Sequence, residues 1–214
     1  LAVDFAGEGA PFRVLDGVSF DVFAGQTLAL VGESGSGKSV TAQSILRILP
    51  RAARIVGGAI TFLDPLDGKR AEIASLDGDG AIMRALRGGR IAMIFQEPMT
   101  SLSPLHTIGD QVAEAVRLHR RAGRAEARAQ AEAVFARVGF SDPRRAFDTY
   151  PFELSGGMRQ RAMIAMALAC RPALLIADEP TTALDVTTQA QILDLLRDLQ
   201  RETGMAVLLI THDL

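Results

Sequence analysis

The segment Gly32-Glu33-Ser34-Gly35-Ser36-Gly37-Lys38-Ser39 constrains the fold of this chain more than any other segment. It fits the pattern G-x-x-x-x-G-K-[ST] at every fixed position. Because glycine lacks a Cβ atom, the backbone can turn tightly there and bring its N–H groups to phosphate oxygens. The sequence therefore predicts a loop that holds the phosphates of a nucleotide. Lys38 is expected to reach the β- and γ-phosphates, and the Ser39 hydroxyl to bind Mg²⁺.

The residues on either side of this loop predict a strand before it and a helix after it. Residues 27–31 are a short apolar run typical of a buried strand. Apolar residues at helical spacing follow the loop, and Pro50 is expected to end that helix. The helix N-terminus would face the phosphates. Kinases, GTPases, helicases and transport ATPases all use such a loop, so the loop alone does not separate these classes.

Composition excludes several other kinds of protein. The 214 residues are 48% hydrophobic, enough for one large α/β domain or a core with an inserted subdomain. The net charge of −2 gives no basic field that would attract nucleic acid. The longest apolar runs, such as residues 162–170, are far shorter than the ~20 residues of a membrane span. A single cysteine, Cys170, excludes an internal disulfide and fits a reducing, cytosolic location.

Periodicity and turn residues divide the chain into an α/β part and a helical part. Strands are predicted at residues 1–5, 14–23, 27–31, 59–63, 91–95, 174–177 and 206–211. Residues 64–90 are interpreted as a surface excursion with a short helix near 82–86. Residues 98–145, rich in Ala, Arg and Glu, predict a helical insertion, and residues 188–201 predict a later helix.

Two carboxylates follow the apolar run at residues 174–177. These acids, Asp178 and Glu179, would lie at the C-terminal tip of a buried parallel strand, which is the edge where ligands bind in a doubly wound sheet. Asp178 is expected to hold Mg²⁺ opposite Ser39. Glu179 is expected to orient or deprotonate the attacking water.

Several further motifs make a specific family resemblance. Residues 150–161 (YPFELSGGMRQR) are followed by the acid pair, by Thr181-Thr182-Ala183-Leu184-Asp185 and by Thr211-His212-Asp213. This series resembles the nucleotide-binding domain of ABC transporters over essentially the whole chain. The residues within these motifs are most similar to those of the ATP-binding proteins of dipeptide, oligopeptide and nickel-type importers. Phe152, however, stands where that branch commonly has His.

The resemblance implies one nucleotide-binding domain of the P-loop NTPase fold class, α/β, over residues 1–214. Its RecA-like core, with a mostly parallel sheet and an antiparallel β subdomain, would comprise residues 1–96 and 168–214. An inserted α-helical subdomain, residues 97–167, would carry the signature motif. Members of this branch usually continue past the switch histidine, so the chain is expected to be truncated after residue 214.

The resemblance also implies roles for single residues. Phe5 would stack on adenine with Val14 beside it, Gln96 would sense Mg²⁺ and couple to the membrane subunit, and His212 would lie near the γ-phosphate. The catalytic set is then Glu179, His212 and Gln96, and the metal set is Ser39, Gln96 and Asp178. The nucleotide-binding set is Phe5, Val14, Gly32, Glu33, Ser34, Gly35, Ser36, Gly37, Lys38, Ser39 and Val40.

Partners follow from the same resemblance. A second nucleotide-binding domain would pack head to tail, and each would bind the other's ATP through the residues Leu154, Ser155, Gly156, Gly157, Met158 and Asp185. Integral membrane permease subunits would contact Met99, Leu102 and Pro104, unless these three residues serve ordinary packing. The chain would act as an ATPase, with ATP and Mg²⁺, at the cytoplasmic face of the bacterial inner membrane.

Two other functions stay open at this point. A soluble ABC-type ATPase acting on nucleic acid or the ribosome would need no permease, but DNA-repair members carry a coiled coil or zinc modules that this chain lacks. A small-molecule kinase would not need residues 154–158. The sequence does not identify the cargo that an importer of this kind would carry.

Overall fold

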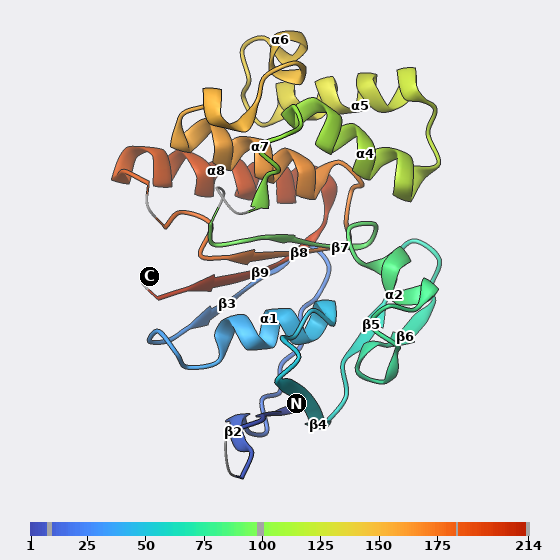
Figure 1. Ribbon diagram of the computed structural model, residues 1–214, viewed down its shortest axis with the longest axis vertical. Helices are drawn as coiled ribbons and strands as arrows, with labels where there is room; N and C mark the ends of the chain where they lie inside the picture. Colours follow the sequence, from blue (N-terminus) through green and yellow to red (C-terminus); the bar gives the residue numbers. More distant parts are fainter. Residues whose placement is uncertain (8–9, 98–100, 183, 213–214) are drawn as a thin grey trace.

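A parallel sheet lies at the centre of the computed structural model, which describes residues 1–7, 10–97, 101–182 and 184–212 (Figure 1). Its strands run in the order β3-β9-β8-β7 and every neighbouring pair is parallel. These strands are β3 (Thr27–Val31), β7 (Ile91–Ile94), β8 (Leu174–Asp178) and β9 (Ala206–Thr211). Because the strands are parallel, their carboxyl ends meet at one edge of the sheet.

Helices cover both faces of this sheet. Figure 1 shows α1 (Lys38–Leu46) on one side and α7 (Gly156–Leu168) with α8 (Val186–Thr203) on the other. Alternate residues of β8 serve the two faces: Ile176 packs in the cluster with α1, and Leu175 packs in the cluster with α7 and α8. The expectation that the acid pair lies at the C-terminal tip of a buried parallel strand is confirmed, because Asp178 ends β8 and Glu179 follows it.

The expectation that residues 27–31 form a buried strand is half wrong. They do form β3, but Val31 is 47% exposed, and Thr27 and Ala29 are also exposed. The reason is that β3 lies at the edge of the described sheet. Leu28 and Leu30 pack toward α1, whereas the cluster on the opposite face draws its strand residues from β7, β8 and β9.

The helix after the loop ends earlier than expected. Arg47 takes a left-handed conformation (φ 54°) as the C-cap, and its N–H donates to the Ser44 carbonyl. Pro50 therefore lies beyond the helix and does not end it. The helix ends at its C-cap residue, three residues before the proline.

The helices expected between residues 98 and 145 are present and pack beside α7. They are α4 (Ile108–Arg120), α5 (Arg124–Arg137) and α6 (Pro143–Phe147), followed by the 3₁₀ turn η2 (Pro151–Glu153). Thr107 and Asp142 cap α4 and α6 by accepting backbone N–H groups. The exact limits of the helical subdomain stay a prediction.

The smaller β structure differs most from expectation. A three-stranded antiparallel sheet has the order β2-β1-β4, and a separate hairpin joins β5 to β6. These strands are β1 (Ala2–Phe5), β2 (Phe12–Leu15), β4 (Ala53–Gly57), β5 (Thr61–Leu63) and β6 (Arg70–Glu72). The 3₁₀ turn η1 (Ile73–Ser75) and α2 (Ala81–Leu86) complete this region, so the short helix near 82–86 is confirmed.

The predicted strand at residues 14–23 is wrong. The strand ends at Leu15 because Gly17 turns the chain with a φ of 70°. Phe20 and Val22, which supplied the alternating pattern, instead pack against the cluster around α1. Their apolar side chains therefore serve packing and not a strand ladder.

Within the part of the chain that the structure describes, none of the helices combines the length and the apolar character that a membrane span requires.

Candidate nucleotide-binding site

The predicted phosphate loop lies between β3 and α1, at the carboxyl edge of the sheet. Gly35 and Gly37 have φ values of 82° and 91°, a region that side chains rarely adopt. A Cβ atom added at Gly37 would lie 2.6 Å from Leu15 Cδ2 and 3.4 Å from the Val14 carbonyl oxygen. The loop therefore rests directly on β2, which explains why Gly37 has no side chain. Val14 also lies beside the loop, and its expected place next to adenine stays a prediction.

Lys38 folds back over the loop that precedes it. Its ammonium group donates to the carbonyl oxygens of Gly32 at 2.6 Å and Glu33 at 2.8 Å. Gly37 is the N-cap of α1, so the first N–H groups of the helix point toward the same loop. A fixed cation and unpaired helix N–H groups are the donors that phosphate oxygens need.

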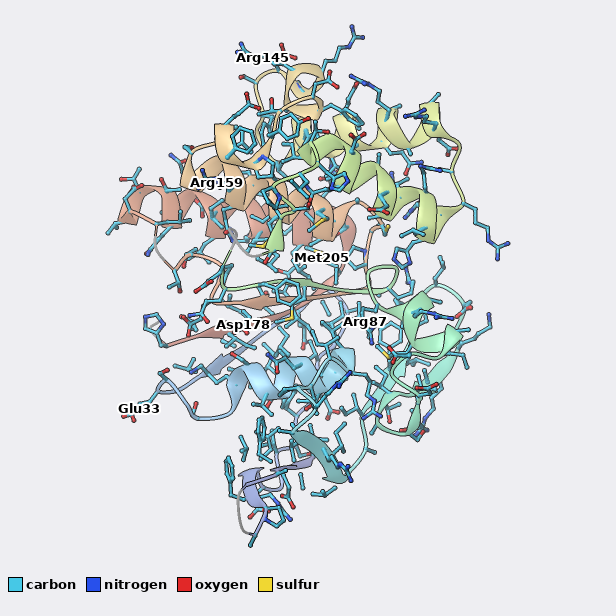
Figure 2. All side chains as sticks on the ribbon, viewed as in Figure 1. Glu33, Arg87, Arg145, Arg159, Asp178 and Met205 are labelled. Carbon is cyan, nitrogen blue, oxygen red and sulfur yellow. The ribbon has the colours of Figure 1, made fainter. Side chains whose placement is uncertain are left out.

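Ser39 meets Asp178 across the sheet edge. The Ser39 hydroxyl donates to the Asp178 carboxylate at 3.2 Å, and Asp178 is only 4% exposed. Burial raises the pKa of Asp178 above its ordinary value; the nearby Glu179 raises it further, while Ser39 and Lys38 oppose the shift. A buried carboxylate beside a hydroxyl offers two oxygen ligands to a hard cation, so these residues fit Mg²⁺. In Figure 2, Asp178 lies at the same end of the sheet as Glu33, the outer tip of the loop.

Three side chains from three segments converge on one oxygen of Glu179. Gln96 Nε2 donates to Oε2 at 2.9 Å, Thr182 Oγ1 donates to it at 3.0 Å, and His212 Nδ1 lies 3.4 Å from it. The predicted catalytic set Gln96, Glu179 and His212 is thus brought together at the ends of β7, β8 and β9. Thr182 was not predicted as a site residue, although it lies within the quoted TTALD motif.

Glu179 has an unusual backbone conformation. Its φ is 47°, and its N–H donates to the Ile210 carbonyl at 2.9 Å. The left-handed region costs a non-glycine residue roughly 1–2 kcal/mol. The side chain of Glu179 is therefore held at the sheet edge at a cost in stability.

We expect Glu179→Gly to be more stable than Glu179→Ala. Both variants remove the carboxylate, but glycine adopts a φ of 47° without strain and alanine does not. The difference should be about 1 kcal/mol, or roughly 2–4 °C in the midpoint of thermal unfolding. Circular dichroism of the two nucleotide-free variants measures it. Equal midpoints would show that the backbone at residue 179 is not strained.

The residues expected to act on a partner's ATP form a second group. Ser155 is the N-cap of α7, and its hydroxyl accepts the Met158 N–H at 3.3 Å. Asp185 caps α8 by accepting the N–H of Thr188 at 3.0 Å and its hydroxyl at 2.7 Å, which lowers the Asp185 pKa. A Cβ atom at Gly157 would lie 3.0 Å from Thr188 Cγ2, so the two helix starts are packed together.

This second group lies away from the phosphate loop of its own chain. Figure 1 shows α7 and α1 on opposite sides of the sheet. In the described ranges, no hydrogen bond or ion pair joins residues 154–158 to residues 32–39. Ser155 and Gly156 are exposed. Their N–H and hydroxyl groups are open to a ligand from outside the chain.

The remaining expectations concern the aromatic residue for adenine and the candidate permease contacts. Phe5 stacks on Phe12 across β1 and β2, with ring centroids 5.8 Å apart, and Phe12 is 56% exposed. Sequence reasoning did not identify Phe12. The candidate permease contact Leu102 is wrong, because it is 4% exposed and packs in the helical core. Pro104 is exposed, and Met99 lies outside the described residues.

The parallel sheet, the loop before α1 and the acid pair at the end of β8 together define a P-loop NTPase. The additional residues 154–158 and 181–185 narrow this class. Residues 15–182 match the family described as ABC transporter, and the chain belongs to that family.

Relatives and solved structures agree with this membership. The chain is 57% identical to the probable peptide ABC transporter ATP-binding protein of Sinorhizobium fredii, over all of this chain and 62% of that protein. It is 53% identical to the glutathione import ATP-binding protein of Pectobacterium atrosepticum, over all of this chain and 34% of that protein. It therefore spans less than two thirds of either relative's length. A dimeric ATP-binding cassette in a post-hydrolysis state, bound to ADP and Pi, superposes with a TM-score of 0.82 and 28% identity, over 99% of this chain and 85% of that one.

Proposed function

We propose that this chain binds and hydrolyses ATP and thereby powers a membrane importer of peptides or related small solutes. The observation that carries the proposal is the meeting of Gln96, Glu179 and His212 beside the Ser39–Asp178 pair. All five residues lie at the sheet edge from which the phosphate loop emerges. The names of the relatives, which refer to peptides and glutathione, support the class of cargo.

In the proposed reaction, the loop N–H groups and Lys38 bind the phosphates of ATP. Glu179 accepts a proton from a water molecule whose oxygen attacks the γ-phosphorus, and the bond to the bridging oxygen of ADP breaks. His212 would hydrogen-bond the γ-phosphate, and Gln96, together with Ser39 and Asp178, would help to hold the metal. Mg²⁺, held by Ser39 and Asp178, would supply positive charge to offset the charge of the phosphate oxygens.

The proposed assembly is a head-to-tail dimer of nucleotide-binding domains. The exposed start of α7 would offer the Ser155 hydroxyl and the Gly157 N–H to the ATP of the partner. The dimeric state of the related solved cassette supports this assignment. Closure of the dimer on ATP and its release after hydrolysis would move permease subunits, which we propose lie against the segment after Gln96 and against Pro104. The chain would then be a peripheral protein at the cytoplasmic face of the membrane.

Copurification from membranes tests this function. The full-length protein, tagged and expressed in its own cell, should bring down a multi-span permease after detergent extraction, as identified by mass spectrometry. Reconstituted with that permease, it should hydrolyse ATP faster when peptides and their binding protein are present. Recovery of ribosomes or nucleic acid instead, with no membrane protein, would contradict the transport function.

A further inference from the structure

The three groups that meet Glu179 Oε2 are held in different ways. Gln96 and His212 are exposed and follow the ends of β7 and β9. Thr182 is half-buried and belongs to the same turn as Glu179, because its N–H donates to the Glu179 carbonyl at 3.2 Å. Thr182 is thus tied to Glu179 by backbone as well as by side chain.

This double attachment gives the Thr182 contact a distinct property. A hydroxyl fixed within the same turn keeps its place relative to Glu179 when neighbouring segments shift. Gln96 and His212 approach from other strands, so their distances to Glu179 depend on how the segments after those strands are placed. The Thr182 hydrogen bond is the contact that depends least on those segments.

The chemistry of a general base explains why such a contact matters. A carboxylate accepts a proton well only when one oxygen is aimed at the water, and side-chain rotation otherwise spreads its orientation. A donor at 3.0 Å on Oε2 fixes the torsion of the carboxylate and leaves the other oxygen to receive the proton. Glu179 is 15% exposed at its side chain, so bulk water supplies little competing hydrogen bonding.

We propose that Thr182 is a positioning residue that orients the carboxylate of Glu179 for proton transfer. This inference rests on the proposed function, in which Glu179 is the base. It assigns to Thr182 no contact with nucleotide or metal. The hydroxyl acts through Glu179 alone.

The neighbouring Thr181 provides a matched control. It has the same residue type, the same half-buried exposure and the same turn. Its backbone carbonyl accepts from Leu184 N at 3.2 Å and from Gln189 Nε2 at 3.3 Å, contacts that a side-chain substitution preserves. Among the described residues, its hydroxyl makes no hydrogen bond comparable to that of Thr182.

Steady-state ATP hydrolysis by the full-length protein with its permease tests the proposal. Thr182→Val, which keeps the shape and removes the hydroxyl, should lower kcat about tenfold with KM for ATP unchanged. Thr182→Ala, which cannot overfill the turn, should give the same loss. Thr182→Ser should restore most of the rate, and Thr181→Val should match the wild type.

The outcomes separate this proposal from the function on which it rests. A wild-type kcat for Thr182→Val, no rescue by Thr182→Ser, or an equal loss in Thr181→Val would each overturn the positioning role. Full activity of Glu179→Gln in the same assay would instead overturn the assignment of the base. Fluorescent ATP binding to each variant, expected to be unchanged, verifies that the loss occurs after binding.

Discussion

Glu179→Gln is expected to bind ATP normally and to lose turnover by about 10²–10⁴-fold, the usual contribution of a positioned general base. Glutamine keeps the size of the side chain and its carbonyl oxygen can still accept from Gln96 and Thr182, which lie 2.9 Å and 3.0 Å from Oε2. It cannot take a proton from water at neutral pH. The loss should therefore appear in kcat and not in the affinity for ATP.

A pair of measurements on the full-length protein with its permease checks this result. Phosphate release gives kcat, and equilibrium binding of a fluorescent ATP analogue gives the dissociation constant. Glu114→Gln, the same chemical change on the exposed surface of α4, should leave both values unaltered. A Glu179→Gln enzyme that turns over ATP within tenfold of the wild type would remove Glu179 from the role of base.

Ser155→Arg is expected to abolish ATP-driven dimerisation while each chain still binds ATP. Ser155 is exposed at the start of α7, and Figure 1 shows α7 on the opposite side of the sheet from α1, the helix that follows the chain's own phosphate loop. An arginine there would place a long side chain where the partner's nucleotide must approach. It would leave the contacts of Lys38, Ser39 and Asp178 in place.

Light scattering after gel filtration, with ATP and Mg²⁺ present, distinguishes the monomer from the dimer. The Glu179→Gln background prevents hydrolysis during the run. Because Ser155 caps α7, its loss should also cost about 1 kcal/mol of stability, which thermal unfolding measures separately. Ala125→Arg, which adds the same side chain to the exposed first turn of α5, controls for bulk and charge. A dimer of unchanged mass in Ser155→Arg would exclude residue 155 from the interface.

The sequence predicted those parts of the site that consist of a short local motif or that come at the carboxyl end of a parallel strand. The loop at residues 32–39 depends on glycines and a lysine within eight positions, and the structure builds it between a strand and a helix. Asp178 and Glu179 follow an apolar run, so their place at the sheet edge could be expected from parallel pairing. The family resemblance added Gln96 and His212, which no local pattern marks.

The parts that sequence missed depend on long-range contacts. β4 pairs with β1 across some fifty residues of chain, and its residues Ala53–Gly57 carry little alternating pattern of their own. Leu102 was a candidate permease contact with ordinary packing as the alternative, and it packs in the helical core. Sequence could not decide between the two, because apolar residues of a contact surface and of a core have the same composition. The contact of Thr182 with Glu179 required side-chain geometry, which spacing alone does not give.

The register of the central sheet limits how this site can change shape. Ile94 pairs with Ala177, and Asp178 with Ile210, in an unbroken parallel ladder. A strand in such a ladder cannot slide by one residue without exchanging its two faces. The carboxyl ends of β7, β8 and β9 therefore keep fixed positions relative to one another, and the chain leaves each strand at a fixed point. A backbone movement that separates Gln96 or His212 from Glu179 can therefore occur in the few residues beyond a strand end, while the strands themselves keep their register.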